Sequence, residues 1–323
     1  MLEKNAEEGS HVQVEQTIRI QPGESGVRLD SILARRFPVM NREDWQERIR
    51  EGFVLLRGQA ARPSARPATG DEVRFTFTRR PEPEVNRNVS VIFENDEAVV
   101  ISKPPNLPVH PSGIYFKNTL VSVLRDLWPS NPPRMVHRLD RETSGCMLLA
   151  KSSSGAARLQ KQFLSGKIRK EYLVIVFGDF PDYLDASGFL SPAGRPVRKK
   201  LKFTYESSPG SLSARTEFTR VAKAGQASLI RARLHSGRMH QIRATLCSLG
   251  FPLVGDRLYG VDDSLYLKLV HDQETPEDVA RLGMDRTALH SNLLEFESEG
   301  KQQIACAPMP DDMEQALAAM RGS

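Results

Sequence analysis

Apolar and polar residues show two periodicities along this chain, and each periodicity predicts a different kind of element. In the first eighty residues, near-alternation predicts strands over residues 12–20 and 73–77, whereas apolar residues three and four apart predict a helix over residues 27–37. A second helix is expected to begin after Asn41, a favourable N-cap, and to end at Gly52 before a short apolar strand. This region therefore predicts two short helices in tandem beside a small sheet.

The rest of the chain predicts a longer, strand-rich region with helices at irregular intervals. Strands are expected at both ends of 89–103, over 167–177, 216–221 and 228–234, and near residues 293 and 304. Helices are expected from Thr119 to Pro129, over 154–164, from Met239 to Leu249, and from Asp311 onward. Because strands and helices do not alternate regularly, we predict an α+β fold with a mixed, mostly antiparallel central sheet, and helices and loops around it.

Two stretches of this region carry basic residues. Residues 183–210 are expected to be loop-rich, with a basic patch made of Arg195, Arg198, Lys199, Lys200 and Lys202. Residues 167–177 are expected to form a strand whose apolar half is covered on both faces. Its basic end, with Lys167, Arg169 and Lys170, is expected to emerge at a surface. Tyr172 stands at the junction, where a half-buried tyrosine with a hydrogen-bonded hydroxyl is typical.

The composition of the 323 residues is that of an ordinary globular chain and excludes several classes of protein. The longest apolar runs, 146–150 and 173–177, are far shorter than the roughly 18 residues of a membrane span, and residues 1–10 are too polar for a secretory signal. The three cysteines lie far apart, and no metal-binding or nucleotide-binding motif is present. We therefore expect a soluble, cytoplasmic monomer that binds no membrane and needs no metal, nucleotide or other cofactor.

Positive charge is concentrated near the N-terminus. The whole chain has a net charge of +5, and the segment from Gly26 to Arg80 alone holds twelve arginines, seven acidic residues and no lysine. The planar guanidinium of arginine matches phosphate in a bidentate way, which lysine cannot do. An all-arginine set therefore favours a nucleic-acid partner over a helical face that is merely solvated.

This arginine-rich segment contains RLDSILARRFP, NREDWQERIREGFVLLRG and ATGDEVRF, and it resembles the small RNA-binding module named after ribosomal protein S-four. The resemblance covers residues 26–79 and implies an RNA-binding domain over residues 26–80. Residues 1–25 would then be an N-terminal extension, residues 81–88 a linker, and residues 89–323 a second, larger domain. The expected RNA contacts of the module are Arg28, Arg35, Arg36 and Arg50. A basic dimerisation module is the structural alternative.

The stretch HRLDRETSG, residues 137–145, sets one acid, Asp140, between Arg138 and Arg141 just before an apolar run. Opposite charges within a few ångström lower a carboxyl pKa by roughly 1–3 units when the group is partly buried. An ionised carboxylate in a fixed position can act as a nucleophile or a base. Taken alone, the stretch is more often a structural ion pair that holds a loop.

A third informative stretch begins at Leu234, where a strand is expected to end. Ser236 and Gly237 turn the chain, and a helix is expected to follow. The opening turns of this helix carry Arg238, His240, Gln241 and Arg243. Hydrogen-bond donors grouped at the start of a helix favour the binding of an anion.

Five segments, in this order, resemble the RluA-type pseudouridine synthases. They are VIFENDEAVVISKPPNLPVHPSG, VHRLDRETSGCMLLAKS, KIRKEYLVIVFG, LHSGRMHQIRATLCSLGFPLVGDRLYG and RTALHSNLLEFE, and they cover most of residues 89–308. Within them, HRLDRETSG is highly specific. The resemblance implies the pseudouridine synthase fold, with a catalytic cleft in residues 89–323. It also implies an isomerase that needs no cofactor and converts specific uridines of structured RNA, either large-subunit ribosomal RNA or transfer RNA, to pseudouridine.

The resemblance further implies roles for single residues. Asp140 would be the catalytic carboxylate, attacking the sugar or taking a proton from it, and Arg243 would pair with it. Tyr172 would stack on the base and help to remove the proton from carbon 5. The target nucleotide would be flipped out of the RNA; Arg138 would fill the space that it leaves, while Arg141 would brace the loop. Further RNA contacts are expected from Arg238, His240 and Gln241.

Two other interpretations stay open at this point. A glycosidase-like hydrolase would also place an acid near an anomeric carbon, but it requires a second carboxylate, and Glu142 lies in the same turn as Asp140. A catalytically silent RNA-binding or ribosome-assembly factor would use the N-terminal module, and Asp140 would then be structural only.

Overall fold

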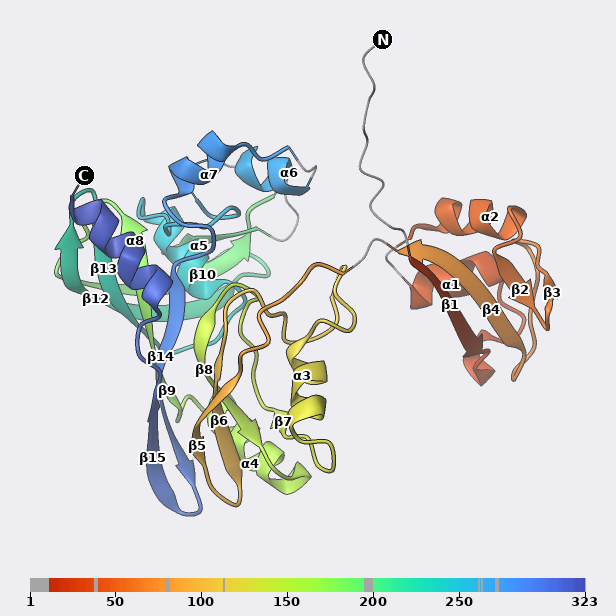
Figure 1. Cartoon of the computed structure of the whole chain (residues 1–323), viewed down its shortest axis with the longest axis horizontal. Coiled ribbons are helices and arrows are strands. Elements are labelled where there is room, and N and C mark those ends of the chain that lie inside the picture. Colours follow the sequence, from red (N-terminus) through yellow and green to blue (C-terminus); the bar gives the residue numbers. More distant parts are fainter. Residues whose placement is uncertain are drawn as a thin grey trace, which may run out of the picture. The chain divides into compact units, whose positions relative to one another are not determined.

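The computed structural model describes residues 12–37, 40–79, 82–112, 114–194, 200–260, 262, 264–270 and 273–322. The chain divides into two compact units. One comprises Met1–Pro83 with Ser112–Phe116, and the other comprises Glu84–Pro111 with Lys117–Ser323. We call them the N-terminal and the C-terminal unit, and Figure 1 labels their elements. Within the described ranges, no helix has the length and apolar character needed to cross a membrane.

The N-terminal unit packs two helices against a small antiparallel sheet. Its elements are β1 (Val12–Arg19), a 3-10 turn η1 (Pro22–Glu24), α1 (Leu29–Arg36), α2 (Arg42–Arg50), β2 (Val54–Leu56), β3 (Gln59–Ala60) and β4 (Glu72–Arg79). The strands lie in the order β1-β4-β2-β3. Asn41 caps α2 as predicted, because its side chain accepts hydrogen bonds from the N–H groups of Glu43 and Asp44. Trp45 and Phe75 meet edge to face, with ring centres 5.1 Å apart, in a core of the unit's own.

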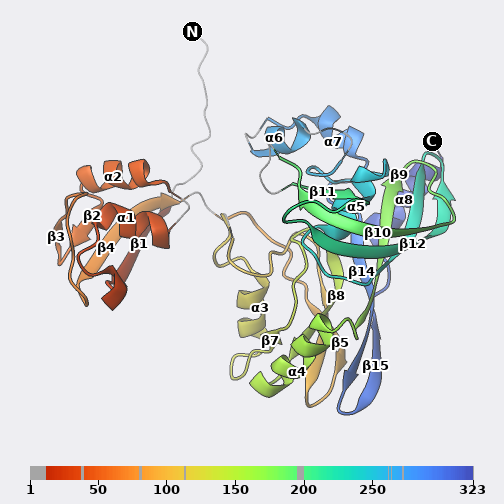
Figure 2. The same cartoon turned by 180° about the vertical axis from the view of Figure 1, so that it is seen from behind.

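The C-terminal unit is built on one large sheet. Its strands are β5 (Ser90–Glu94), β6 (Ala98–Lys103), β7 (Arg134–Met135), β8 (Ser144–Ala150), β9 (Arg169–Phe177), β10 (Tyr183–Pro192), β11 (Leu201–Thr204), β12 (Leu212–Ala224), β13 (Ala227–Leu234), β14 (Leu289–Ser298) and β15 (Lys301–Cys306). Its helices are α3 (Leu120–Leu127), α4 (Ser153–Leu164), α5 (Gln241–Ser248), α6 (Ser264–Val270), α7 (Pro276–Leu282) and α8 (Asp311–Arg321). The main path of the sheet runs β11-β10-β12-β13-β9-β14-β8-β6-β5. Figure 2 shows β10 and β12 side by side in this sheet.

The predicted α+β class with a mixed, mostly antiparallel sheet is confirmed. Strands β8 and β14 pair in parallel at the centre, where Gly145 lies opposite Ser291. Gly145 has a φ of +104°, and a Cβ at this position would lie 2.2 Å from the carbonyl oxygen of Ser291, so no other residue fits. This close approach fixes the start of β8, and with it the loop that holds Asp140.

The prediction of a loop-rich region over residues 183–210 is wrong. Residues 183–192 form β10, which pairs with β11 and β12. The buried positions of β10 include Ala186 and Gly188, and these small residues hide the alternation on which strand prediction depends. Arg195, Arg198 and Lys199 of the predicted basic patch lie outside the described residues.

The prediction for residues 239–282 needs two corrections. Met239 was placed on the apolar stripe of a helix, but α5 begins only at Gln241, and Met239 is 54% exposed. Helices α6 and α7 were not predicted, because each has only seven residues and a short segment shows little periodicity.

The basic end of β9 also differs from the prediction. Arg169 is exposed as expected, but Lys170 is only 7% exposed. Lys170 lies opposite Leu234 of β13 and Leu294 of β14, so it is a central position of the sheet and not an emerging end. The pairing of distant strands, which the local pattern does not contain, buries it.

Candidate active site

Asp140 lies in the loop between β7 and β8, and its closest cation is Arg243 of α5. The Nη1 atom of Arg243 donates a 2.9 Å hydrogen bond to Oδ2 of Asp140. The Asp140 side chain is 28% exposed, whereas that of Arg243 is 12% exposed. The carboxylate therefore faces an open space while the guanidinium behind it is almost fully covered.

Asp256 holds the other side of the Arg243 guanidinium. Its two oxygens accept hydrogen bonds of 2.6 and 2.8 Å from Nε and Nη2, a bidentate pair of fixed geometry. The same carboxylate accepts 2.9 Å hydrogen bonds from the N–H groups of Leu258 and Tyr259, and Asp256 is fully buried. Arg243 is thus aimed by Asp256 and presents its remaining nitrogen to Asp140.

The pKa values of Arg243 and Asp256 follow from the same contacts. Burial alone would lower the pKa of Arg243, but Asp256 and Asp140 outweigh it and raise the pKa. Burial alone would raise the pKa of Asp256, but Arg243 and the two backbone N–H groups outweigh it and lower the pKa. Both groups are therefore charged at every ordinary pH.

Tyr172 of β9 lines the same pocket. This pocket is formed by Arg138, Leu139, Asp140, Thr143, Tyr172, Leu234, Arg238, His240, Gln241, Ile242, Arg243 and Leu289. Tyr172 is 7% exposed, and burial, with a smaller contribution from Asp140, raises the pKa of its hydroxyl to about 12. The three predicted catalytic residues thus meet in one pocket, with apolar side chains between them and a phenol that stays protonated at neutral pH.

The arginines beside Asp140 in the sequence do not supply the ion pair that was expected of them. Arg138 is exposed on the pocket wall, and Arg141 donates a 2.8 Å hydrogen bond to Glu142. The cation that pairs with Asp140 comes instead from Arg243, a hundred and three residues away. The local sequence therefore indicated the wrong cationic partners for Asp140.

Glu142 does not provide a second catalytic carboxylate. One of its oxygens accepts hydrogen bonds of 2.9 and 2.7 Å from the N–H and hydroxyl of Thr287, and the other accepts from Arg141. Burial alone would raise the pKa of Glu142, but Arg141 and Thr287 lower it. An ionised carboxylate that is fully used in internal hydrogen bonds cannot serve as the acid of a glycosidase pair.

His240 stands beside the carboxylate with an unusual backbone. Its φ is +52°, just before the first residue of α5, and its Nδ1 lies 3.1 Å from the hydroxyl of Tyr259. Its Nε2 lies 3.9 Å from Oδ1 of Asp140. Burial is the main cause that lowers the pKa of His240, so the ring is neutral at pH 7.

The other predicted RNA contacts fall into different environments. Arg238 is exposed at the pocket mouth, and its Nε donates to the carbonyl of Ser213. Gln241 is only 3% exposed, and its amide bonds the Arg238 N–H, the Thr216 hydroxyl and the Arg215 carbonyl. These internal bonds leave Gln241 no group for RNA, so the structure contradicts that contact and gives Gln241 the role of a loop brace.

Within the N-terminal unit, the arginines predicted to contact RNA differ in how far their side chains are used in internal ion pairs. Arg28 binds the fully buried carboxylate of Asp30 at 2.7 Å, and Arg36 binds the buried Glu24. Arg35 also reaches Glu24, at 3.4 Å, but its side chain is 60% exposed. Arg50 is exposed and donates one hydrogen bond to Gln46. Arg28 and Arg36 therefore stabilise the unit, while Arg35 and Arg50 are more available to a partner.

Two residues of the site were missed by sequence reasoning, namely Asp256 and Lys103. Asp256 follows Gly255 in a Gly-Asp pair that is typical of a turn, and nothing local indicates that it faces Arg243. Lys103 is fully buried, and its ammonium donates to the carbonyl groups of Pro104, Leu107 and Arg141 at 2.8 to 3.1 Å. Because Arg141 follows Asp140, Lys103 ties the loop that holds Asp140 to the loop after β6. Burial lowers the pKa of Lys103 to about 7.

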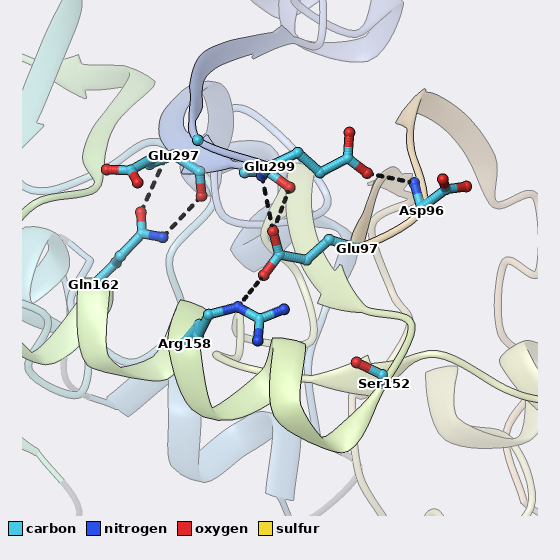
Figure 3. A pocket seen from close by; sticks show the side chains of 9 residues that line it. Asp96, Glu97, Ser152, Arg158, Gln162, Glu297 and Glu299 are labelled. Atoms are coloured by element: carbon cyan, nitrogen blue, oxygen red, sulfur yellow. Dashed lines mark hydrogen bonds and ion pairs between the residues drawn. The ribbon is translucent and has the colours of Figure 1, made fainter.

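A second hollow, at another edge of the sheet, is lined by acidic residues but offers no comparable chemistry (Figure 3). Arg158 of α4 donates a 2.6 Å hydrogen bond to Glu97, which also accepts one from the Glu299 N–H. Gln162 exchanges two hydrogen bonds with the backbone of Glu297. These contacts fasten α4 to the turn after β5 and to the end of β14. Among the described residues, no group of acids, histidines or cysteines is arranged to hold a metal ion.

Comparisons with known proteins agree with this geometry. Residues 97–248 match the model of a family described as RNA pseudouridylate synthase. A ribosomal large subunit pseudouridine synthase D of Xanthomonas campestris pv. campestris is 34% identical over 309 residues, which cover 92% of this chain and 90% of that protein. The mitochondrial tRNA pseudouridine(32) synthase of Saccharomyces cerevisiae is 32% identical over 226 residues, 68% of this chain and 48% of that protein.

The fold has a solved counterpart. The structure of human RNA Pseudouridylate Synthase Domain Containing 4 superposes with a TM-score of 0.56 at 22% identity, over 72% of this chain and 93% of that chain. The fold and the pocket together define an enzyme with the pseudouridine synthase fold. The chain belongs to the RNA pseudouridylate synthase family, and so it isomerises uridine to pseudouridine in RNA. The family predicted from the sequence is confirmed, and the roles of single residues stay predictions.

Replacing Tyr172 by phenylalanine tests the predicted role of the tyrosine. The ring remains to stack on the base, so we expect RNA affinity to stay within about twofold of the wild type. The loss of a proton-transferring hydroxyl should slow the chemical step by on the order of 10²-fold. Single-turnover rates of pseudouridine formation and filter binding measure the two effects separately. Tyr172→Leu should lose both, and an unchanged rate for the phenylalanine variant would exclude the hydroxyl from the reaction.

Proposed function

We propose that this enzyme modifies one or more uridines of large-subunit ribosomal RNA, with Asp140 as its catalytic carboxylate. The support for the ribosomal substrate is the extent of the match to the Xanthomonas protein, 92% of this chain and 90% of that one. The match to the yeast transfer RNA enzyme covers only 48% of the yeast protein. We further propose that the enzyme acts as a monomer in the cytoplasm.

The reaction breaks the bond between the sugar and N1 of uracil, turns the base and rejoins it through carbon 5. We propose that the target nucleotide is flipped into the pocket, at a cost of a few kcal/mol, and that Arg138 at the pocket mouth takes its place in the RNA. Asp140, aimed by Arg243, then attacks the sugar or takes a proton from it. Tyr172 stacks on the detached base, and the apolar walls keep the base in the pocket while it turns.

The test uses purified enzyme and unmodified transcripts of large-subunit ribosomal RNA and of transfer RNA. Carbodiimide treatment followed by primer extension maps each pseudouridine that is formed. We expect product at discrete positions of the ribosomal transcript and none in the transfer RNA set. Modification confined to transfer RNA would contradict the proposed substrate, and no product on either RNA would favour a catalytically silent RNA-binding factor.

We also propose that the N-terminal unit is the S-four-like RNA-binding domain predicted over residues 26–80, with residues 81–88 as the linker. Strand β1 pairs with β4, so the domain begins before residue 26, inside the stretch that was predicted to be an N-terminal extension. Arg35 and Arg50 are its best available phosphate contacts, since both are exposed. Replacing both by glutamine should weaken RNA binding and lower the slope of log K against log salt by roughly 1.4, or 0.7 for each lost contact with single-stranded RNA. Binding titrations at several salt concentrations measure this slope.

Arg36→Gln is the matched control for this prediction. It removes the same charge from the same helix, but Arg36 donates two hydrogen bonds to the buried Glu24, whereas Arg35 reaches Glu24 with one nitrogen at 3.4 Å. We therefore expect Arg36→Gln to lower the melting temperature more than the double variant does. A salt slope that stays at the wild-type value in the double variant would exclude these two arginines as phosphate contacts.

A further inference from the structure

A different cavity, of about 570 Å³, borders the pocket that contains Asp140 and Arg243, which we call the catalytic pocket. The chemistry proposed for Asp140 does not explain this cavity. The two share four wall residues, which are Arg138, Tyr172, Leu234 and Arg238. The rest of the cavity is lined by His137, Phe163, Leu164, Gly166, Lys170, Ser213, His235, Ser236 and Gly237. Whatever occupies this cavity lies directly beside a nucleotide bound at Asp140.

The cavity is cationic. Arg138, Lys170 and Arg238 contribute three positive charges to its wall, and none of its described lining residues carries a carboxylate. His235 adds a ring nitrogen that lies 3.2 Å from Glu217, a residue outside the lining. Like charges gathered in one hollow repel one another, so the arrangement favours an anion that comes from outside.

Lys170 gives the strongest indication of a bound anion. It is 93% buried on β9, yet in the described part of the chain its ammonium has no hydrogen bond and no ion pair. The ammonium lies over the ring of Phe163, whose centre is 5.9 Å away. Lys103, the other buried lysine, is bonded to three carbonyl groups of the same unit. A buried charge costs free energy unless it is paired, so the fold satisfies Lys103 and leaves Lys170 open to a ligand.

The room for such a ligand is the cavity itself, whose volume is about 570 Å³. Gly237 also lies near the ammonium, since a Cβ at that position would be 3.7 Å from the Lys170 Nζ, and its lack of a side chain keeps this wall low. The ring of His137 is stacked on Phe163, and its Nε2 accepts a 2.9 Å hydrogen bond from the Leu148 N–H. This bond requires the proton on Nδ1, because burial lowers the pKa of His137 to about 3 and keeps the ring neutral.

We propose that this cavity, which we call the Lys170 pocket, binds a phosphodiester group of the RNA backbone next to the flipped nucleotide. The proposal rests on the proposed function, since it assumes that RNA enters the neighbouring pocket at Asp140. Lys170 supplies the buried charge, and Arg138 and Arg238 supply guanidinium groups at the rim. Anchoring the backbone beside the target holds the strand in place while the base is outside the stack.

Lys170→Met tests this proposal, with Lys167→Met as its matched control. Lys167 carries the same charge three residues earlier, but it is exposed and does not line the pocket. For Lys170→Met we expect RNA affinity to fall roughly tenfold, as for the loss of one charged hydrogen bond, and the salt slope to fall by about 0.7. Lys167→Met should change neither of these values.

Methylphosphonate substitution then locates the contact. Short RNAs that carry the modified site are prepared with one neutral methylphosphonate at each position near the target uridine. We expect one linkage at which the wild type loses about tenfold in affinity and Lys170→Met loses nothing further. Unchanged affinity and salt slope in Lys170→Met, or no linkage that distinguishes the two proteins, would overturn the proposal.

Two controls keep the outcomes separate. Removing an unpaired buried charge should leave the melting temperature unchanged or higher. If the variant is nevertheless less stable, the methylphosphonate scan of the wild type alone decides, because a scan without a sensitive linkage overturns the proposal. If the wild type binds ribosomal RNA but modifies none of it, the proposed function fails while the binding and salt data still decide the Lys170 pocket.

Discussion

Asp140→Asn should abolish pseudouridine formation while leaving RNA binding intact. Asparagine keeps the size of the side chain and can still accept the hydrogen bond from Arg243, but it can neither attack a sugar carbon nor accept a proton from it. Loss of a nucleophile or base of this kind lowers the rate by on the order of 10⁴-fold or more. The measurement is the single-turnover rate on unmodified ribosomal transcript, followed for long enough to detect the residual activity.

The structure indicates that Asp140→Asn changes the reaction without disturbing the fold. The Asp140 side chain is 28% exposed, and Arg243 keeps its bidentate bonds to Asp256 when Asp140 is changed. We therefore expect the melting temperature and RNA affinity to stay near those of the wild type. Asp179→Asn is a suitable control, because Asp179 also pairs with basic side chains but is exposed, lies between β9 and β10 and does not line the pocket at Asp140. Wild-type turnover by Asp140→Asn would exclude Asp140 as the catalytic carboxylate.

The parts of the fold that could be predicted from sequence are those with local causes. Asn41 and Thr119 cap α2 and α3 as expected, because an N-cap bonds N–H groups two or three residues away. The apolar run of β9 after Tyr172 is buried as its composition indicates. In contrast, β10 was missed because small residues replace the large apolar ones on its inner face.

The ion pairs of the site join residues that are far apart in the sequence, so they could not be predicted from local patterns. The sequence places Arg138 and Arg141 beside Asp140, yet the cation that the fold supplies is Arg243, which β9, β14 and α5 bring to the same pocket. The burial of Lys170 has the same origin, since it depends on β13 and β14 closing over β9. Among the sequence signals, only the family resemblance linked Asp140, Tyr172 and Arg243. It did not indicate that Asp256 aims Arg243, which the structure shows.

Asp256→Asn should give the largest loss of stability in the C-terminal unit and should slow the reaction as well. It leaves a buried guanidinium without its main partner, and breaking a buried ion pair by removing one side costs about 3–5 kcal/mol. The two Asp256 oxygens also fix the direction of Arg243, so the variant lets the guanidinium and Asp140 shift. A misplacement of about 1 Å can cost on the order of 10²-fold in rate. Calorimetry and single-turnover kinetics measure the two losses.

Asp278→Asn is the control that separates aiming from stability. The Asp278 carboxylate is 5% exposed and pairs with Lys268 at 2.8 Å, but it does not line the catalytic pocket. We expect this variant to lower the melting temperature and to keep the wild-type rate at temperatures where it is folded. If Asp256→Asn also kept the wild-type rate, Asp256 would be structural only.

The stability difference between wild type and Asp256→Asn should depend on pH in one direction. The pKa of Asp256 is lower in the folded protein than its unfolded value of about 3.9, so its stabilising effect is complete above that value. It is lost as the pH falls below about 3.9 toward the folded pKa, where protonation removes the charge in the wild type too. The two unfolding free energies should therefore differ most near neutral pH and converge in acid. A difference that stayed constant as the pH fell would show that Asp256 stabilises the fold by packing and not by its charge.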